Sequence, residues 1–169
     1  MPSSTPARKS ATTKDAFSEL QGALAERPGF LIRRLHQIHV ALFHDECGRF
    51  NITPVQYSVL TALRDDELDQ KHLGHSVGID RATTTEVLRR LEKTGWLERR
   101  KCTEDNRRQL ASLTEAGRRL LDEVDASAQA AHDRTVEPLT RAERARFIRY
   151  MIKIVSASND HGRASLKLP

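Results

Sequence analysis

The tight turn Gly78-Ile79-Asp80 constrains the fold of this chain more than any other feature of its sequence. Gly78 can adopt positive φ without steric cost and so end one helix, and Asp80 can accept backbone hydrogen bonds at the start of the next. Residues that face inward at helical spacing flank the turn on both sides; they are Leu73, Val77, Thr84, Val87, Leu88 and Leu91. The pattern predicts two short helices joined by a tight turn.

Beyond Gly95 the spacing of apolar residues changes from helical to alternating. Residues 96–100 and 109–113 indicate two short strands around a charged loop, 101–108. Two joined helices followed by such a hairpin form a winged helix-turn-helix. In that motif the second helix enters the major groove of DNA, and the hairpin, called the wing, reaches an adjacent groove or the backbone.

The net charge of +5 is unevenly distributed along the chain. Residues 15–160 hold 23 basic and 23 acidic side chains, so the tails 1–14 and 161–169 carry the whole excess. Within the neutral body, residues 15–80 sum to −4 and residues 81–108 to +4. The predicted second helix and wing therefore form the basic part of the body, which favours a polyanionic partner.

The exposed face of the predicted second helix carries side chains suited to base edges. Arginine can bind guanine through two hydrogen bonds, threonine can touch a thymine methyl group, and glutamate can accept a hydrogen bond from cytosine. Arginines further along the helix suit phosphates, which position a protein without specifying sequence. The candidate DNA-binding residues are Arg81, Thr83, Thr85, Glu86, Arg89, Arg90, Arg107 and Arg108.

An ordinary capped helix with a solvated basic face would show the same helical pattern, so the hairpin decides between the two interpretations. Its cations crowd a short loop, where a polyanion would relieve their mutual repulsion. They are Arg99, Arg100, Lys101, Arg107 and Arg108.

Helical patterns also flank this central segment. Phe17, Leu20 and Leu24 indicate a short helix that ends before Pro28-Gly29, and a longer helix with a stripe of Leu31, Leu35, Ile38 and Leu42 follows it. Capping boxes begin at Thr53 and Thr140. The stripes at both ends exceed what a small winged domain can cover, which favours burial between two copies of the chain.

These patterns predict a mainly α fold with a small β wing, a winged helix-turn-helix within an α-helical homodimer. The expected segments are a disordered basic tail (1–12), N-terminal dimerisation helices (13–52), the winged DNA-binding domain (53–113), C-terminal dimerisation helices (114–160) and a basic tail (161–169). The family resemblance described next implies that segment 13–52 also binds a ligand.

Several spaced motifs together resemble the MarR family of bacterial transcription regulators. They are Thr53-Pro54-x-Gln56, Gly78-Ile79-Asp80-Arg81-Ala82-Thr83, Leu91-Glu92-Lys93-x-Gly95, Asp105-x-Arg107-Arg108 and Leu113-Thr114-x-x-Gly117. The resemblance implies a homodimer with two winged domains on a palindromic operator, and repression relieved by a small ligand. It also implies that Arg81, Thr83, Thr85 and Glu86 face bases and that Arg107 enters the minor groove.

The resemblance places the effector pocket beside the first long helix, where the candidate ligand-binding residues are Arg33, Arg34, His36, His39 and Phe43. Arginine pairs with carboxylate or phosphate, so these residues suit an anionic, partly apolar ligand. Side chains that reach solvent or a partner helix are the alternative. The run 28–37 resembles a subgroup that controls breakdown of hydroxycinnamates and other aromatic acids, some members of which sense the aryl-CoA thioester, such as p-coumaroyl-CoA.

Redox control is an alternative trigger, because some relatives sense oxidants through cysteine. The chain has only Cys47 and Cys102. Cationic neighbours at residues 99–101 favour a reactive thiolate at Cys102, although no resolving cysteine is evident.

An enzyme is the less favoured class. His36 and His39 have the spacing of two metal ligands on one helix, but the chain has no His-Glu-x-x-His, no nucleophile elbow and no phosphate-binding glycine loop. We therefore expect no cofactor and no metal. With no apolar core in residues 1–14 and no long apolar run, we expect a cytoplasmic protein with no membrane partner.

Overall fold

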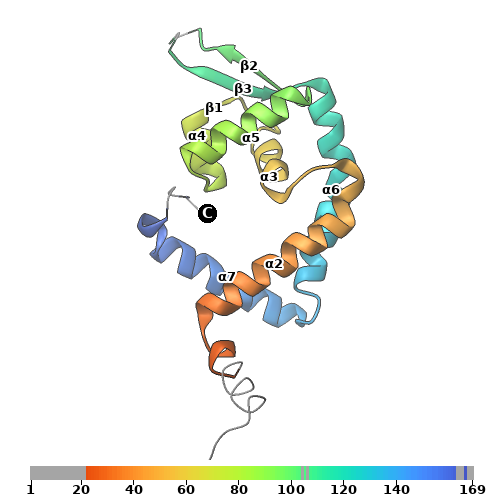
Figure 1. Cartoon of the computed structure of the whole chain (residues 1–169), viewed down its shortest axis with the longest axis vertical. Coiled ribbons are helices and arrows are strands. Elements are labelled where there is room, and N and C mark those ends of the chain that lie inside the picture. The colour runs from red at the N-terminus through yellow and green to blue at the C-terminus, as the bar shows by residue number, and fades with distance from the viewer. Residues whose placement is uncertain (1–21, 104, 106, 163–165, 167–169) are drawn as a thin grey trace, which may run out of the picture. The chain divides into compact units, whose positions relative to one another are not determined.

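The computed structural model describes residues 22–103, 105, 107–162 and 166, which form mainly helices and one small antiparallel sheet (Figure 1). The elements are α2 (Pro28–Cys47), α3 (Pro54–Ala62), β1 (Leu68–Asp69), α4 (Gln70–Val77), α5 (Arg81–Lys93), β2 (Leu97–Lys101), β3 (Gln109–Leu113), α6 (Glu115–Thr135) and α7 (Arg141–Ala157), with single 3-10 turns at Gly48–Phe50 and Asn159–His161. The predicted fold class is confirmed.

Two compact units divide the chain after Ile38, which lies within α2. In the first unit, residues 22–25 are helical and Pro28 begins α2. Phe17, Leu20 and the predicted tail 1–12 lie outside the described residues, as do most residues of the tail 161–169. No helix in the described part of the chain has the length and apolar character needed to cross a lipid bilayer.

The helix starts follow the local signals in the sequence. The carboxylate of Asp80 accepts a hydrogen bond from the backbone N–H of Thr83 at 2.9 Å, and Gly78 has φ of +74°. Thr53 and Thr140 both complete capping boxes, and the hydroxyl of Thr114 accepts from Gly117 N–H. Each cap satisfies backbone donors that the first helical turn leaves without partners, which explains why these residues begin helices.

The sheet has the order β1-β3-β2, and all its strand pairs are antiparallel. In the β2–β3 hairpin, Leu97 lies opposite Leu113 and Lys101 opposite Gln109, and the hairpin extends away from α4 and α5 (Figure 1). The predicted wing is therefore present, with its first strand starting one residue later than expected. The short strand β1, which pairs with the middle of β3, was not predicted.

The core of the second unit joins α3 to α6 and the sheet. Its largest fully buried side chains include Phe43, Leu60, Leu73, Leu88, Leu91, Leu97, Leu121 and Val124. All four residues expected to face inward from α5 are buried. Val55, in the first turn of α3, is 37% exposed, whereas Val59 and Leu60 of the same helix are buried.

Candidate nucleic-acid interface

The first turn of α5 presents a short exposed surface next to the turn at Gly78. Arg81, Ala82 and Thr83 are all exposed, and the hydroxyl of Thr83 donates to the Asp80 carboxylate at 3.0 Å. That bond leaves the oxygen of Thr83 available as an acceptor. The guanidinium of Arg81 has no hydrogen-bond or ion-pair partner among the described residues, so it can meet a base or a phosphate.

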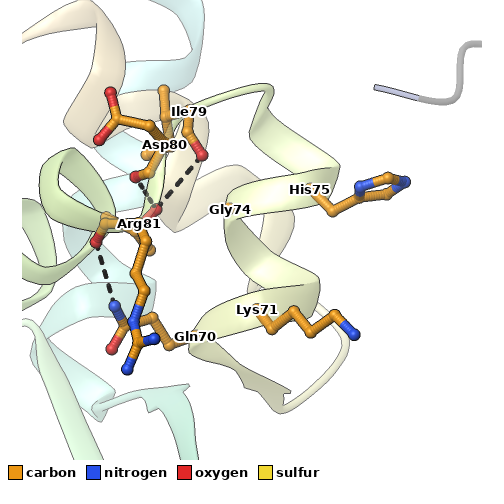
Figure 2. A pocket seen from close by; sticks show the side chains of 8 residues that line it. Gln70, Lys71, Gly74, His75, Ile79, Asp80 and Arg81 are labelled. Carbon is orange, nitrogen blue, oxygen red and sulfur yellow. Dashed lines mark hydrogen bonds between the residues drawn. The ribbon is translucent and has the colours of Figure 1, made fainter. Parts of the chain in front are cut away.

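Thr85 is held more tightly than its position on the exposed face suggests. Its hydroxyl donates to the carbonyl oxygen of Arg81 at 2.8 Å and accepts from the Gln70 side-chain amide at 2.6 Å. The same amide donates to the Arg81 carbonyl at 3.1 Å, as Figure 2 shows. Because the hydroxyl already has a donor and an acceptor partner, the methyl group of Thr85 is the part best able to contact a base.

Glu86 binds two arginines of its own helix. Its carboxylate accepts from Arg89 at 2.9 and 3.0 Å and from Arg90 at 2.7 Å. Hydrogen bonds from Arg89 and then Arg90 lower the pKa of Glu86 to about 2. The carboxylate expected to accept from cytosine is therefore already engaged, and it holds both guanidinium groups over the exposed face of α5.

Two wing arginines pair with acids of the helical body. The guanidinium of Arg99 binds Glu92 of α5, and that of Arg100 binds Glu67, which precedes β1; both Nε distances are 3.1 Å. These bonds lower the pKa of Glu92 and that of Glu67. The repulsion expected within the hairpin is thus relieved in part by carboxylates that lie outside it.

A third ion pair joins the wing to α4. Nε and Nη2 of Arg108 lie 2.9 and 2.6 Å from one oxygen of Asp69, whose other oxygen caps α4 by accepting from the backbone and ring nitrogens of His72. Burial alone would raise the pKa of Asp69, but the hydrogen bonds from His72 and Arg108 outweigh it and lower the pKa to about 2. Arg108 therefore ties the end of the wing loop, just before β3, to the start of α4.

The tip of the wing is shaped by Asp105. Its carboxylate accepts from the backbone N–H of Arg107 at 2.9 Å, and its carbonyl oxygen accepts from the N–H of Arg108 at 2.9 Å. Asp105 therefore binds the backbone of Arg107 and not its guanidinium. Within the described residues, the exposed guanidinium of Arg107 has no hydrogen-bond or ion-pair partner, and neither has the ammonium of Lys101.

The candidate ligand residues of the first unit lie on the exposed surface of α2. The guanidinium of Arg33 lies 5.3 Å from the ring centre of Phe30, and that of Arg34 donates to the Gln37 side chain at 3.3 Å. His36 is exposed. None of these contacts uses the full hydrogen-bonding capacity of a guanidinium group.

The other two candidate ligand residues belong to the second unit. Nδ1 of His39 lies 2.9 Å from the Thr135 hydroxyl, and its ring stacks on that of His132 at 5.1 Å. Phe43 is 1% exposed, and its ring centre lies 5.9 Å from that of Tyr57. His39 thus joins α2 to α6, and Phe43 fills the core beside α3.

Both cysteines are buried. Burial raises the pKa of the Cys47 thiol, and the charge of Glu46 adds to the effect. Cys102 is 7% exposed, and its backbone N–H donates to the carbonyl of Arg108. Neither thiol has the accessibility that redox control requires. The described residues also contain no cluster of three His, Cys, Asp or Glu side chains suited to a metal ion.

The residues that hold the interface in place were not predicted from the sequence. Thr85 is bound by Gln70, and the wing arginines are bound by Glu67, Asp69 and Glu92. Only Asp69 gave a local signal, as a helix cap. The other three contact partners between 7 and 33 residues away, so no short-range pattern indicates them.

Comparisons with known proteins agree with this geometry. The model of the MarR family matches residues 52–108, from just before α3 to the end of the wing loop. Over 140 residues the chain is 26% identical to the transcriptional repressor NicR of Pseudomonas putida, covering 82% of this chain and 89% of NicR.

Two solved structures show the same fold. BpsR of Bordetella bronchiseptica, whose DNA binding is regulated by 6-hydroxynicotinic acid, is 32% identical, with a TM-score of 0.74 over 77% of this chain and 94% of BpsR. The repressor CouR of Rhodococcus jostii, bound to a 23-mer DNA duplex, is 27% identical, with a TM-score of 0.74 over 80% of this chain and 96% of CouR. The match extends well beyond the winged domain, and the chain belongs to the MarR family, whose members are DNA-binding transcription regulators and not enzymes.

Proposed function

We propose that this chain is a ligand-responsive repressor that binds a palindromic operator as a homodimer. In this proposal it controls an operon for the breakdown of aromatic acids and leaves the operator when an aromatic acid or its CoA thioester binds.

The observation that carries the DNA-binding role is the pairing of the wing cations. Arg99, Arg100 and Arg108 are tied to the helical body, whereas Lys101 and Arg107 project from the hairpin with no partner among the described residues. A hairpin whose strands and loop end are held by ion pairs, with the exposed Arg107 in its loop, suits the minor groove, whose negative potential attracts inserted arginine.

On α5 we assign base contacts to its first turns. Arg81 and Thr83 have the freedom to hydrogen-bond with base edges, and Thr85 offers its methyl group to thymine. Arg89 and Arg90, held by Glu86, are directed to the phosphate backbone.

The homodimer is supported by the surface of α7. No residue of this helix is buried, and its exposed apolar side chains include Ile148, Met151, Ile152, Ile154 and Val155. An apolar surface of this extent on one helix favours a partner that covers it. We assign the dimerisation role to residues 13–52 and 114–160, and the effector pocket to the α2 residues Arg33, Arg34, His36, His39 and Phe43.

The aromatic effector is supported by two observations. α2 combines the guanidinium groups of Arg33 and Arg34 with His36 on an exposed surface, which suits a carboxylate or phosphate. BpsR, which shares the fold over most of its length, is regulated by an aromatic acid, 6-hydroxynicotinic acid.

The DNA-binding role is tested with Arg107→Ala. A duplex is first selected from a random library by the unmodified protein, and affinities for it are measured by fluorescence anisotropy. We expect Arg107→Ala to weaken binding at least about tenfold, because one good groove contact contributes about 1–3 kcal/mol. The control is Arg119→Ala, which removes an exposed arginine of α6 that pairs with Glu115. An Arg107 variant that binds like the unmodified protein would show that the wing tip does not contact DNA.

The effector is tested by titrating the same complex with 6-hydroxynicotinate, p-coumarate and p-coumaroyl-CoA. We expect one of these compounds to release the duplex, and Arg34→Ala to raise the concentration it requires. If none of the three compounds releases the duplex at saturation, the proposal of an aromatic effector is wrong, and the DNA-binding role is unaffected.

A further inference from the structure

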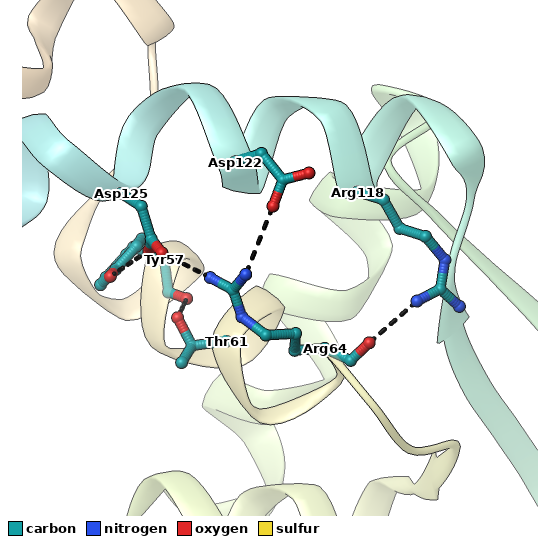
Figure 3. A network of polar contacts seen from close by, with 6 residues as sticks. All are labelled: Tyr57, Thr61, Arg64, Arg118, Asp122 and Asp125. Atoms are coloured by element: carbon teal, nitrogen blue, oxygen red, sulfur yellow. Dashed lines mark hydrogen bonds and ion pairs between the residues drawn. The ribbon is translucent and has the colours of Figure 1, made fainter.

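Three polar side chains on one face of α6 form hydrogen bonds at the C-terminal end of α3. Arg118, Asp122 and Asp125 are spaced four and three residues apart, so they lie in a row along the helix, as Figure 3 shows. All three contact Arg64, which stands two residues beyond the last residue of α3.

The carboxylate of Asp125 binds one residue within α3 and one just after it. One of its oxygens accepts from the Tyr57 hydroxyl at 2.8 Å, and the other accepts from Nη2 of Arg64 at 2.8 Å. Tyr57 lies in the first half of α3, and Arg64 lies two residues after its end. Because one carboxylate on α6 binds both residues, the bonds oppose rotation of α3 about its own axis.

Two further bonds secure the C-terminal end of α3. Nη1 of Arg64 lies 3.3 Å from Asp122, and Nη1 of Arg118 donates to the backbone carbonyl of Arg64 at 2.8 Å. Carbonyl groups at a helix end otherwise depend on water or a local cap. We call the set formed by Tyr57, Arg64, Arg118, Asp122 and Asp125 the α3–α6 clamp.

The clamp is half-buried and its bonds are charge-assisted. The side chains of Arg64 and Asp125 are 35% and 45% exposed, and the Tyr57 ring packs against the buried ring of Phe43. Burial raises the pKa of Tyr57, and the hydrogen bond to Asp125 raises it further, so the phenol stays a donor. The contacts are therefore well defined rather than those of two flexible surface chains.

α3 lies between α6 and the DNA-facing helices. It packs against both α4 and α5 as well as α6. A change in the rotation of α3 relative to α6 would therefore move α5. In the proposed dimer, α6 belongs to the dimerisation helices, and the two copies of α5 must meet half-sites one helical turn apart.

We propose that Asp125 is a positioning residue that, through Tyr57 and Arg64, sets the separation of the two recognition helices and so the half-site spacing that the protein accepts. This inference rests on the proposed function. It assigns to the clamp a specificity role that is distinct from any contact with DNA.

The test measures affinity for three duplexes: the selected palindrome, and the same half-sites with one base pair added or removed between them. One base pair rotates the second half-site by about 35° and shifts it by about 3.4 Å. We expect the unmodified protein to prefer its own spacing by about tenfold or more. In Asp125→Asn we expect this preference to fall below about threefold, with affinity for an isolated half-site unchanged within about twofold.

Two variants separate positioning from stability. Tyr57→Phe removes only the hydroxyl and keeps the ring against Phe43, so this variant should fold. We expect it to lose part of the spacing preference, less than Asp125→Asn does. Glu115→Gln breaks an exposed ion pair of α6 with Arg119, outside the clamp, and should keep the spacing preference. A purely structural role would weaken all three duplexes equally.

The outcomes distinguish the two proposals. If the unmodified protein selects no palindromic duplex, the proposed function and the clamp proposal are both wrong. If it selects one and prefers its spacing, but Asp125→Asn and Tyr57→Phe show the same preference, only the clamp proposal is overturned.

Discussion

Gly117 illustrates how one residue can depend on a contact that local sequence does not reveal. A Cβ atom at this position would lie 1.9 Å from the carbonyl oxygen of Trp96, and that oxygen accepts a hydrogen bond from Thr114 N–H. The glycine therefore lets the start of α6 approach the backbone before β2. The resemblance to the MarR family singled out Gly117, but the reason for it lies in tertiary packing.

We expect Gly117→Ala to lower the free energy of unfolding by about 3 kcal/mol, because backbone rather than a flexible side chain must move. Urea denaturation followed by circular dichroism measures the change. Gly48→Ala is the control, since its Cβ would meet only the His44 ring at an ordinary 3.7 Å. Equal stability of the two variants would contradict the close approach.

The predictability of the candidate site also differs from residue to residue. Asp80 was identified as a helix cap because its partner, Thr83, lies three residues away. The hydrogen bond from Gln70 to Thr85 was not predicted, because Gln70 lies 15 residues earlier on another helix. Exposure of Arg107 followed from its place in a charged loop, whereas the anchoring of Arg108 depends on Asp69, 39 residues before it.

At the level of elements, the helices were predicted better than the sheet. Capping boxes and apolar stripes are local, so the starts of α3, α5, α6 and α7 were confirmed. β1 is two residues long and is defined by its pairing with β3, so it is too short to show the alternating pattern that indicates a strand.

The junction of β1, α4 and the wing makes a prediction about pH. Asp69 has its pKa lowered from 3.8 to about 2, so its ionised form is stabilised in the folded state. That stability is fully present above the unfolded pKa near 4 and is lost as pH falls toward about 2; at pH 7 it amounts to about 2 kcal/mol.

Asp69→Asn removes the charge and keeps a good helix cap. We expect a loss of about 2 kcal/mol in the free energy of unfolding at pH 7 and at pH 5, and a smaller difference from the unmodified protein below pH 4. Urea titrations at four pH values measure it. A variant as stable as the unmodified protein at pH 7 would show that the charge of Asp69, held by His72 and Arg108, does not stabilise the fold.

At the scale of the whole molecule, the decisive feature is the exposed apolar surface of α7. The helical pattern at the C-terminal end of the chain predicted an apolar stripe, and Ile148 in this helix is 46% exposed. Periodicity predicts an apolar stripe on a helix without specifying which chain covers it.

We expect Ile148→Glu to raise the dissociation constant of the proposed dimer at least about 100-fold, because a two-fold interface buries the same unpaired charge twice. Sedimentation equilibrium measures the dissociation constant. Lys153→Glu alters an exposed charge on the same helix and serves as the control. A monomer in the unmodified protein, or an unchanged dimer in Ile148→Glu, would argue against this interface.

The ion pairs of α5 and the wing also determine how binding responds to salt. Of the nine basic residues in 81–108, five already hold a carboxylate of the protein, namely Arg89, Arg90, Arg99, Arg100 and Arg108. These five arginines share four carboxylates, because Glu86 binds both Arg89 and Arg90, so the ion pairs neutralise four of the nine positive charges. A positive charge that stays neutralised displaces no cation from the phosphates. Five uncompensated positive charges per chain remain within the described residues, or ten in the proposed dimer. The slope of log K against log salt concentration should therefore not exceed about 9 in magnitude, against about 16 from the count of basic residues alone.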